Sequence, residues 1–267
     1  PGNREFEFRK VPKVVGGVTP QCMEVASAFF SAFVDQVVPV SSPRIAEMTK
    51  LLENTFRGVN IALVNELAML SHRMGIDIWE VIDAATTKPF GFMPFYPGPG
   101  VGGHCIPVDP FYLSWKAKEY DFYVNFIQLA AETNDHMPYY TLSRIGEILS
   151  DCGKPLKGAR LLMLGVAFKE NISDTRNSPA IRVMELLMER GADVGYSDYN
   201  VPDLCVNGKA MQSLTVDSNL LQQFDAVVIL LKHTGHDLAH IVNNSPLVID
   251  ARNATCDLGP RANLVKI

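Results

Sequence analysis

Apolar side chains recur every three or four residues from position 44 to about position 74, a spacing that predicts one long amphipathic helix. Ser42 followed by Pro43 is a typical N-cap and first-turn pair, and Gly75 is a typical C-terminal stop. At a rise of about 1.5 Å per residue the helix spans roughly 45 Å, and its broad apolar faces favour the spine of a dimer. The apolar positions are Ile45, Met48, Leu52, Phe56, Val59, Leu63, Leu67 and Leu70.

A short strand–helix–strand pattern precedes this helix. The run 13–17 reads as a buried strand, Thr19 and Pro20 begin a helix that extends to about position 34, and 36–40 reads as a second strand. Such a piece is too small to bury a core alone, so we expect it to be the closing unit of a larger α/β domain. The chain begins with Pro1 rather than Met, and we expect that an N-terminal part is absent from it.

Strands alternate with helices after position 154, which indicates a doubly wound parallel sheet. The predicted fold is therefore α/β: a helical central region with a long spine helix, followed by a Rossmann-like sheet. Strands are predicted at 160–167, 193–198, 214–216, 226–231 and 247–249, and further helices at 78–85, 110–119, 123–150 and 179–190. Ligands of such sheets bind beyond the carboxyl ends of the strands. The polar residues there are Lys169, Asp198, Lys232 and Arg252.

The composition limits the class of partner. The 267 residues carry a net charge of -5, which argues against bulk nucleic-acid binding and against a polybasic membrane surface. No apolar run approaches the roughly 20 residues of a membrane span, so we expect no membrane insertion. Five cysteines are scattered without a C-x-x-C pair. This usage fits a reducing cytoplasm and disfavours a disulfide scaffold or a structural zinc site.

The stretch 98–110 carries the most suggestive chemistry. It places Cys105 at the end of a glycine run and Asp109 four residues later, the layout of a nucleophilic thiol with an acid–base partner. A lone cysteine is otherwise most often a small buried side chain. The run also reads G-x-G-x-x-G, but no apolar strand precedes it and two prolines follow it, so it lacks the context of a dinucleotide fingerprint. We interpret the glycines as backbone that passes close to a ligand.

Two more groups of polar residues are candidates for a site. Lys50 and Asn54 share one face of the long helix, where they either donate to a developing oxyanion or form an ordinary solvated face. The loop 169–178 precedes a helix start and carries Lys169 and Arg176. It suits phosphate groups, or it is a surface loop capped by its own serine.

Three histidines near the C-terminus also need an interpretation. His233, His236 and His240 are close in sequence, and the last two have a spacing that would allow them to share a zinc ion. No further carboxylate or cysteine ligand is evident there beyond Asp237. We therefore expect solvated loop histidines and no metal site.

Four segments, in this order along the chain, resemble the UDP-glucose/GDP-mannose dehydrogenase family. They are Ala46–Thr55, Gly98–Tyr112, the Ala167–Pro179 stretch with its Asp174-Thr175-Arg176, and Asp250–Asn253. Together they cover nearly the whole chain, which makes the resemblance far more specific than any one segment. Within the family, the segment Lys88–Tyr96 is most similar to UDP-N-acetylglucosamine 6-dehydrogenases, with UDP-N-acetylmannosamine dehydrogenases as near neighbours.

The resemblance implies a three-part architecture. Residues 1–40 would be the C-terminal remnant of an NAD-binding Rossmann domain, 41–153 a helical dimerising domain with the catalytic cysteine, and 154–267 a Rossmann-like UDP-sugar-binding domain. The fingerprint and the ribose-binding acid of the first domain are missing here, as is a glutamate that the family places before Pro1-Gly2. We therefore expect that this chain alone binds NAD poorly and does not turn over.

The resemblance also implies a mechanism, a four-electron oxidation of the sugar C6 alcohol to the acid by two NAD molecules. Cys105 would hold the sugar as a thiohemiacetal and then as a thioester, Lys50 and Asn54 would stabilise the oxyanion, and Asp109 would handle water and protons. Arg176 matches a cofactor contact. The implied substrate contacts are Lys169, Arg252, Phe95, Tyr96, Gly102 and Gly103. A cytoplasmic homodimer or higher homo-oligomer is expected.

Other functions remain open at this point. The substrate would be UDP-N-acetylglucosamine, with UDP-N-acetylmannosamine or UDP-glucose as alternatives. The chain alone would otherwise be an inactive, dimerising module that binds nucleotide sugars. A third hypothesis, a cysteine hydrolase, requires a histidine positioned on Cys105 and no nicotinamide site.

Overall fold

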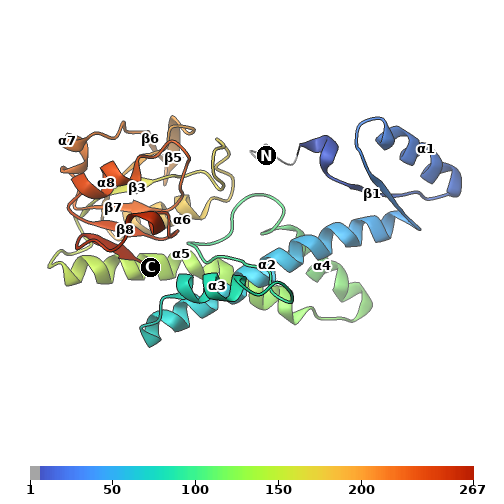
Figure 1. The fold of residues 1–267 in the computed structure, drawn as a ribbon, viewed down its shortest axis with the longest axis horizontal. Coiled ribbons are helices and arrows are strands. Elements are labelled where there is room, and N and C mark those ends of the chain that lie inside the picture. The colour runs from blue at the N-terminus through green and yellow to red at the C-terminus, as the bar shows by residue number, and fades with distance from the viewer. Residues whose placement is uncertain (1–6) are drawn as a thin grey trace.

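The computed structural model describes residues 7–267 and shows three groups of elements along the chain (Figure 1). After a short 3-10 turn, η1 (Phe8–Lys10), strands β1 (Lys13–Gly16) and β2 (Val37–Val40) pair in parallel and are joined by helix α1 (Pro20–Ser31). The predicted strand–helix–strand unit is confirmed for these residues; residues 1–6, assigned to the same part, lie outside the described residues. Helix α1 buries none of its side chains, so one side of this unit is uncovered.

The long helix is confirmed as α2 (Pro43–Met74), which crosses and packs on α5 (Asn125–Asp151) in the centre of the molecule (Figure 1). Pro43 lies in its first turn, and Gly75 ends it in the left-handed conformation at φ +68°. Its most buried side chains are small or carry amides: Asn54, Gly58, Ala62, Val64 and Asn65. The predicted apolar stripe lies instead on the outer side, where all its members except the half-buried Val59 are 40–63% exposed.

Two shorter helices complete the central region. Helix α3 (Ile78–Thr86) follows α2, and Asp77 caps it by accepting a hydrogen bond from the Trp79 N–H. Helix α4 (Asp109–Ala117) packs on both α2 and α5 and runs into the 3-10 turn η2 (Lys118–Tyr120). The segment between α3 and α4, which contains the glycine run, has no helix or strand.

The C-terminal domain is the predicted parallel sheet, in the strand order β4-β3-β7-β8-β9. The strands are β3 (Arg160–Leu164), β4 (Asp193–Ser197), β7 (Ala226–Ile229), β8 (Val248–Asp250) and β9 (Leu264–Lys266). Leu161 and Met163 face a core shared with α6 (Pro179–Glu189) and the second half of α5. Leu162 and Leu164 face a second core with α7 (Ser218–Leu221) and α8 (Leu238–Asn244). Helix α5 therefore packs against α2 in the central region and, with its second half, against one face of the C-terminal sheet.

Two parts of this domain differ from the prediction. The strand predicted at 214–216 is wrong: those residues are irregular, and a hairpin of β5 (Asp203–Val206) and β6 (Lys209–Gln212) precedes them. Its turn is Asn207-Gly208, both at positive φ, the conformation that a two-residue hairpin turn requires. A last 3-10 turn, η3 (Cys256–Leu258), leads to β9, which was not predicted. Over residues 7–267 no helix has the length and apolar character to cross a membrane.

Candidate active site

The glycine run passes between the central helices and the C-terminal domain with almost no free space. A Cβ atom on Gly102 would lie 2.7 Å from Cβ of Phe168 and 2.9 Å from the carbonyl oxygen of Asn177. Gly103 adopts φ +91°, donates its N–H to the Arg176 carbonyl at 3.2 Å, and accepts from the Asn177 amide at 3.0 Å. Glycine is required here because side chains at these positions would separate two packed backbones.

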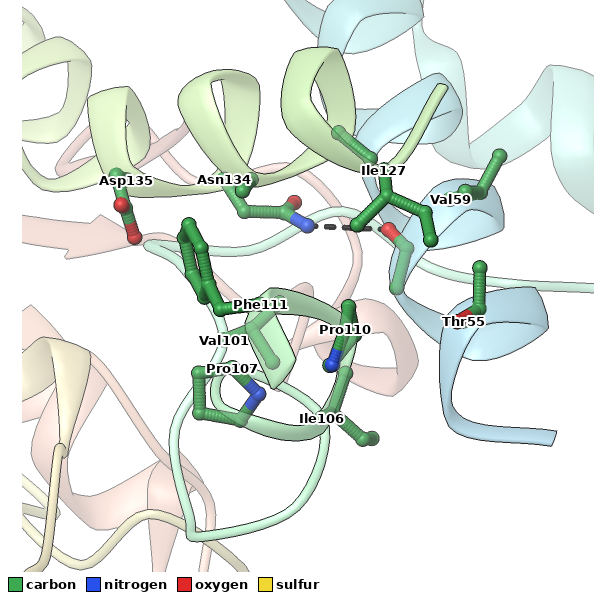
Figure 2. Close-up of a pocket in the computed structure, with 13 residues that line it drawn as sticks. Thr55, Val59, Val101, Ile106, Pro107, Pro110, Phe111, Ile127, Asn134 and Asp135 are labelled. Carbon is green, nitrogen blue, oxygen red and sulfur yellow. Dashed lines mark hydrogen bonds between the residues drawn. The ribbon is translucent and has the colours of Figure 1, made fainter. Parts of the chain in front are cut away.

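The opposite side of the loop rests on the central helices. Figure 2 shows Ile106 and Pro110 lying near Thr55 and Val59 of α2, with Ile127 of α5 completing an apolar floor. This packing and the contacts of Gly102 and Gly103 fix both sides of the loop that carries Cys105. The glycines therefore position the loop by packing, and the strand and helix of a dinucleotide fingerprint do not flank them.

Three of the predicted catalytic side chains converge. The Asn54 amide is fully buried and donates to Oδ2 of Asp109 at 2.5 Å, and Nζ of Lys50 lies 3.8 Å from the same oxygen. Arg57, one turn along α2, donates from Nη2 to the side-chain oxygen Oδ1 of Asn54 at 2.5 Å. Both polar atoms of the Asn54 side chain therefore have hydrogen-bond partners, and the half-exposed ammonium of Lys50 lies near the same Asp109 carboxylate.

Cys105 lies four residues before Asp109, the first residue of α4. Its carbonyl oxygen accepts from the N–H groups of Val108 at 3.2 Å and Asp109 at 2.8 Å, so the turn ties it to the first residue of that helix. Cys105 is exposed, and all five cysteines are free and exposed. The interpretation of Cys105 as a small buried side chain therefore does not hold. The same turn places the Asp109 carboxylate at the start of α4, where it reaches α2.

The polar loop after β3 holds an ion pair of its own. Arg176 donates to both oxygens of Asp174, at 3.0 Å and 2.7 Å, and these hydrogen bonds lower the pKa of the Asp174 carboxyl to about 2. Nε2 of His104 lies 3.8 Å from the same carboxylate. The guanidinium of Arg176, predicted to contact the cofactor, is therefore engaged by a neighbour and is 67% exposed.

Arg252 lies across the loop from the central helices. Its Nη1 is so close to Gly98 that a Cβ there would lie 2.2 Å away, and burial lowers the pKa of its guanidinium, partly opposed by Glu170 and Asp250. Asp250 fixes the turn after β8 by accepting from the N–H groups of Arg252 and Thr255. A cation is thus held against the glycine run, at the carboxyl edge of the sheet where ligands of this fold bind.

The two aromatic residues before the glycine run pack on the central helices. The ring of Phe95 meets that of Phe56 edge-on at 5.7 Å, and the ring of Tyr96 stacks on Trp79 at 5.8 Å. Tyr96 is 45% exposed, so one face of its ring is open to a ligand. Both residues therefore anchor the start of the loop to α2 and α3.

Sequence reasoning missed two buried asparagines that hold the loop. Asn65 on α2 donates to Asn134 on α5 at 2.9 Å and accepts from the Gly98 N–H at 3.0 Å; Asn134 in turn donates to the Gly58 carbonyl at 3.0 Å (Figure 2). Both asparagines are at least nine-tenths buried. An amide within a long, largely apolar helix was the only signal for them in the sequence.

The histidine and sheet-edge predictions need correction. His233 is fully buried and paired with Asp198, also fully buried, at 2.9 Å, and His236 is half-buried, so these are not solvated loop histidines. Burial also lowers the pKa of His236 to about 4. Asp198 was predicted among the residues at the carboxyl ends of the strands, where ligands bind. Its carboxylate instead contacts His233 and the backbone N–H groups of Val166 and Ala167. Within the described residues no cluster of three or more His, Cys, Asp or Glu side chains is arranged to hold a metal ion.

Comparison with known proteins extends this picture. The central domain of the UDP-glucose/GDP-mannose dehydrogenase family matches residues 44–136, and the UDP binding domain of that family matches residues 162–257. The UDP-N-acetyl-D-mannosamine dehydrogenase of Escherichia coli K12 is 33% identical over 258 residues, 94% of this chain and 60% of the relative. The UDP-N-acetyl-D-glucosamine 6-dehydrogenase of Pseudomonas aeruginosa is 39% identical over 199 residues, 74% of this chain and 47% of the relative.

A solved structure agrees with these matches. The UDP-D-ManNAc dehydrogenase of Pyrococcus horikoshii superposes with a TM-score of 0.83 at 30% identity, over 97% of this chain and 60% of that one. The chain thus spans about 60% of the length of the relatives that it matches along nearly its whole length. It belongs to the UDP-glucose/GDP-mannose dehydrogenase family and contains that family's central and UDP-binding domains.

Proposed function

We propose that this chain is the sugar-handling part of a UDP-N-acetylhexosamine 6-dehydrogenase, which oxidises the C6 alcohol of its substrate to a carboxylic acid. The observation that carries the proposal is the convergence of Lys50, Asn54 and Asp109 beside the exposed Cys105 loop. Arg252 lies at the other end of the same glycine run, beside Gly98. A sugar held at the cysteine and a diphosphate held at the arginine would occupy the two ends of one site.

The side chains suit covalent handling of an aldehyde. The Cys105 thiolate adds to the C6 carbonyl, the carbonyl oxygen takes the electron pair, and Lys50 and Asn54 supply donors to the oxyanion that forms. After C6 reaches the thioester level, Asp109 accepts a proton from the attacking water, the bond from C6 to sulfur breaks, and the acid leaves. These steps follow the four-electron oxidation that the resemblance to the family implies.

Hydride removal from C6 at both oxidation steps is the chemistry that NAD supplies in this family. The described part of this chain does not fit that cofactor by itself: the turn between β1 and α1 reads Gly16-Gly17-Val18-Thr19, without a G-x-G-x-x-G fingerprint. We propose that 1–40 is the end of an NAD-binding domain and that the uncovered side of α1 packs against its remainder. The central and sugar-binding parts would then be 41–153 and 154–267.

We propose UDP-N-acetylglucosamine as the substrate, with UDP-N-acetylmannosamine second. The P. aeruginosa relative named for the first sugar is the more similar over its match, at 39% identity, whereas the E. coli relative named for the second matches more of the chain. A hydrolase receives less support, because the imidazole of His104, next to the cysteine, lies near Asp174 and packs edge-on against Phe168.

Calorimetric titration of this chain with UDP-N-acetylglucosamine, UDP-N-acetylmannosamine and UDP-glucose tests the proposal. We expect binding, and we expect Arg252→Gln to weaken it by roughly tenfold or more because a charge-assisted contact to the diphosphate is lost. Arg261→Gln, an exposed arginine in the same domain, is the matched control and should bind as the parent does. Absence of binding by the parent chain to all three sugars would refute the proposal.

We also propose that two copies pair along the outer face of α2. Eight large apolar side chains on that helix are 40–63% exposed, far more contiguous apolar surface than a monomer usually leaves open: Ile45, Met48, Leu52, Phe56, Leu63, Leu67, Leu70 and Met74. Sedimentation velocity should show a dimer that Leu63→Glu converts to monomer. Val25→Glu on α1, another exposed apolar position, should leave the dimer intact; a parent chain that sediments as a monomer contradicts the proposal.

A further inference from the structure

Asp198 and His233 form a fully buried pair at the carboxyl ends of β4 and β7, outside the candidate active site. Nε2 of His233 lies 2.9 Å from Oδ2 of Asp198, and neither side chain is exposed. The same carboxylate oxygen accepts from the N–H groups of Val166 at 2.8 Å and Ala167 at 3.2 Å, directly after β3. In sheets of this type those N–H groups at the first turn are the usual partners of a nucleotide phosphate.

The pair therefore closes the crevice in which such a sheet ordinarily holds a nucleotide. Burial acts to raise the pKa of Asp198, but hydrogen bonds from His233 and from the N–H groups of Val166 and Asn200 outweigh it, and the pKa lies below its usual value. An ionised carboxylate thus occupies the place of an anionic ligand. Lys169 is exposed on the loop 166–176, away from this buried pair.

The other ring nitrogen of His233 holds that loop. Nδ1 accepts from the backbone N–H of Asn171 at 2.9 Å, so the proton of the ring is on Nε2, facing Asp198. Asn171 has φ +59° and is clamped by its side chain: it donates to Oγ1 of Thr234 at 2.8 Å and accepts from the Thr234 N–H at 3.0 Å. Asn171 stands two residues after Lys169, inside a loop closed by the Phe168 N–H donating to the Asp174 carbonyl.

We propose that His233 is a positioning residue for the nucleotide-sugar site: it holds Asn171, and with it the loop 166–176, so that Lys169 meets the diphosphate of the UDP-sugar. The inference rests on the proposed function for the identity of the ligand. In this proposal the exposed side of the loop 166–176 binds the diphosphate. The buried Asp198–His233 pair keeps that loop in position, in addition to stabilising the sheet.

The test is a double-mutant cycle on this chain, with UDP-N-acetylglucosamine affinity measured by calorimetry and folding followed by thermal melting. Asn171→Gly keeps the positive φ and the backbone N–H but removes the side-chain clamp. It should weaken affinity by about tenfold, the effect of a lost hydrogen-bonded contact. In a Lys169→Ala background it should cause no further loss, because its effect passes through Lys169.

Two matched variants sharpen the test. Asn207→Gly changes another exposed asparagine at positive φ, in the β5–β6 turn, and should leave affinity unchanged. His233→Gln keeps one donor and one acceptor and should bind more tightly than His233→Leu, which has neither. If His233→Leu fails to fold, His233→Gln is measured alone and together with Lys169→Ala; it should lower affinity only where Lys169 is present. The Asn171 cycle tests the clamp to Thr234, because Asn171→Gly leaves the N–H that His233 accepts in place.

Each result has one meaning. Additive losses from a folded His233 variant and Lys169→Ala, or parental affinity in folded His233→Leu, would overturn the positioning role while leaving the proposed function intact. No binding of the UDP-sugar by the parent chain would overturn both.

Discussion

Replacing Cys105 by serine in the protein that joins this chain to an NAD-binding domain is expected to lower uronic acid formation by about 10³-fold or more. A serine hydroxyl is not ionised near neutral pH, so it forms no comparable adduct with the C6 aldehyde and leaves no thioester to hydrolyse. The rest of the site is untouched, and affinity for the UDP-sugar should stay close to that of the parent. Quantifying the acid by chromatography, beside calorimetric binding of the UDP-sugar, checks both halves of this prediction.

Cys256→Ser is the matched control, because Cys256 is also free and exposed but lies in η3 of the C-terminal domain. Its acid output should equal that of the parent. Parental output from Cys105→Ser would remove the thiol from the mechanism, whereas loss of UDP-sugar binding would indicate that Cys105 supports the fold of the loop. The two readouts separate a chemical role from a structural one.

The periodicity of α2 predicted the helix, but it did not predict that the apolar stripe would be exposed and the opposite side buried. Leu52, Leu63 and Leu70 are at least half exposed, and the buried positions are Asn54, Gly58, Ala62, Val64 and Asn65. Spacing identifies a helix from its apolar stripe. Which face packs inside one chain depends on the neighbouring helix. That helix, α5, begins at residue 125, which is 51 positions after the end of α2 at residue 74.

The C-terminal domain shows the same division between local and distant information. Buried strands such as β3 and β7 were predicted because their apolar runs are local and continuous. The β5–β6 hairpin was missed although Asn207-Gly208 is a strong local turn signal. The strand β9 contains only two apolar residues in a row, Leu264 and Val265, too short a run to stand out, and it pairs with β8.

For the candidate site, the sequence indicated residue types, and the fold brought them together. Lys50 and Asn54 are one turn apart on a helix, so their shared face followed from spacing. Their meeting with Asp109, 55 residues after Asn54, depends on how α4 docks on α2. The pairing of His233 with Asp198 was equally inaccessible, because two strands of a parallel sheet and their order must be known before the residues at their ends can be matched.

Replacing Lys50 by alanine, again in this chain joined to an NAD-binding domain, is expected to lower kcat by about 10²-fold or more, the usual cost of one missing oxyanion donor. The ammonium stands 3.8 Å from Oδ2 of Asp109 and is half exposed, so it is available to a ligand oxygen at that place. An interaction made mainly with the charge that develops on oxygen affects kcat and kcat/KM together, and leaves substrate affinity nearly unchanged. Steady-state kinetics with direct titration of the UDP-sugar measures each quantity.

Lys116→Ala is the appropriate control, since Lys116 has nearly the same exposure, 53% against 51% for Lys50, and a carboxylate partner of its own in Glu119. A parental kcat is expected for this variant, because Lys116 is in the last turn of α4 whereas Asp109 is its first residue. Should Lys50→Ala retain a parental kcat as well, Lys50 would be an ordinary solvated helix residue. Stabilisation of the oxyanion would then have to come from other donors, such as the second N–H of the Asn54 side-chain amide, whose first N–H donates to Asp109.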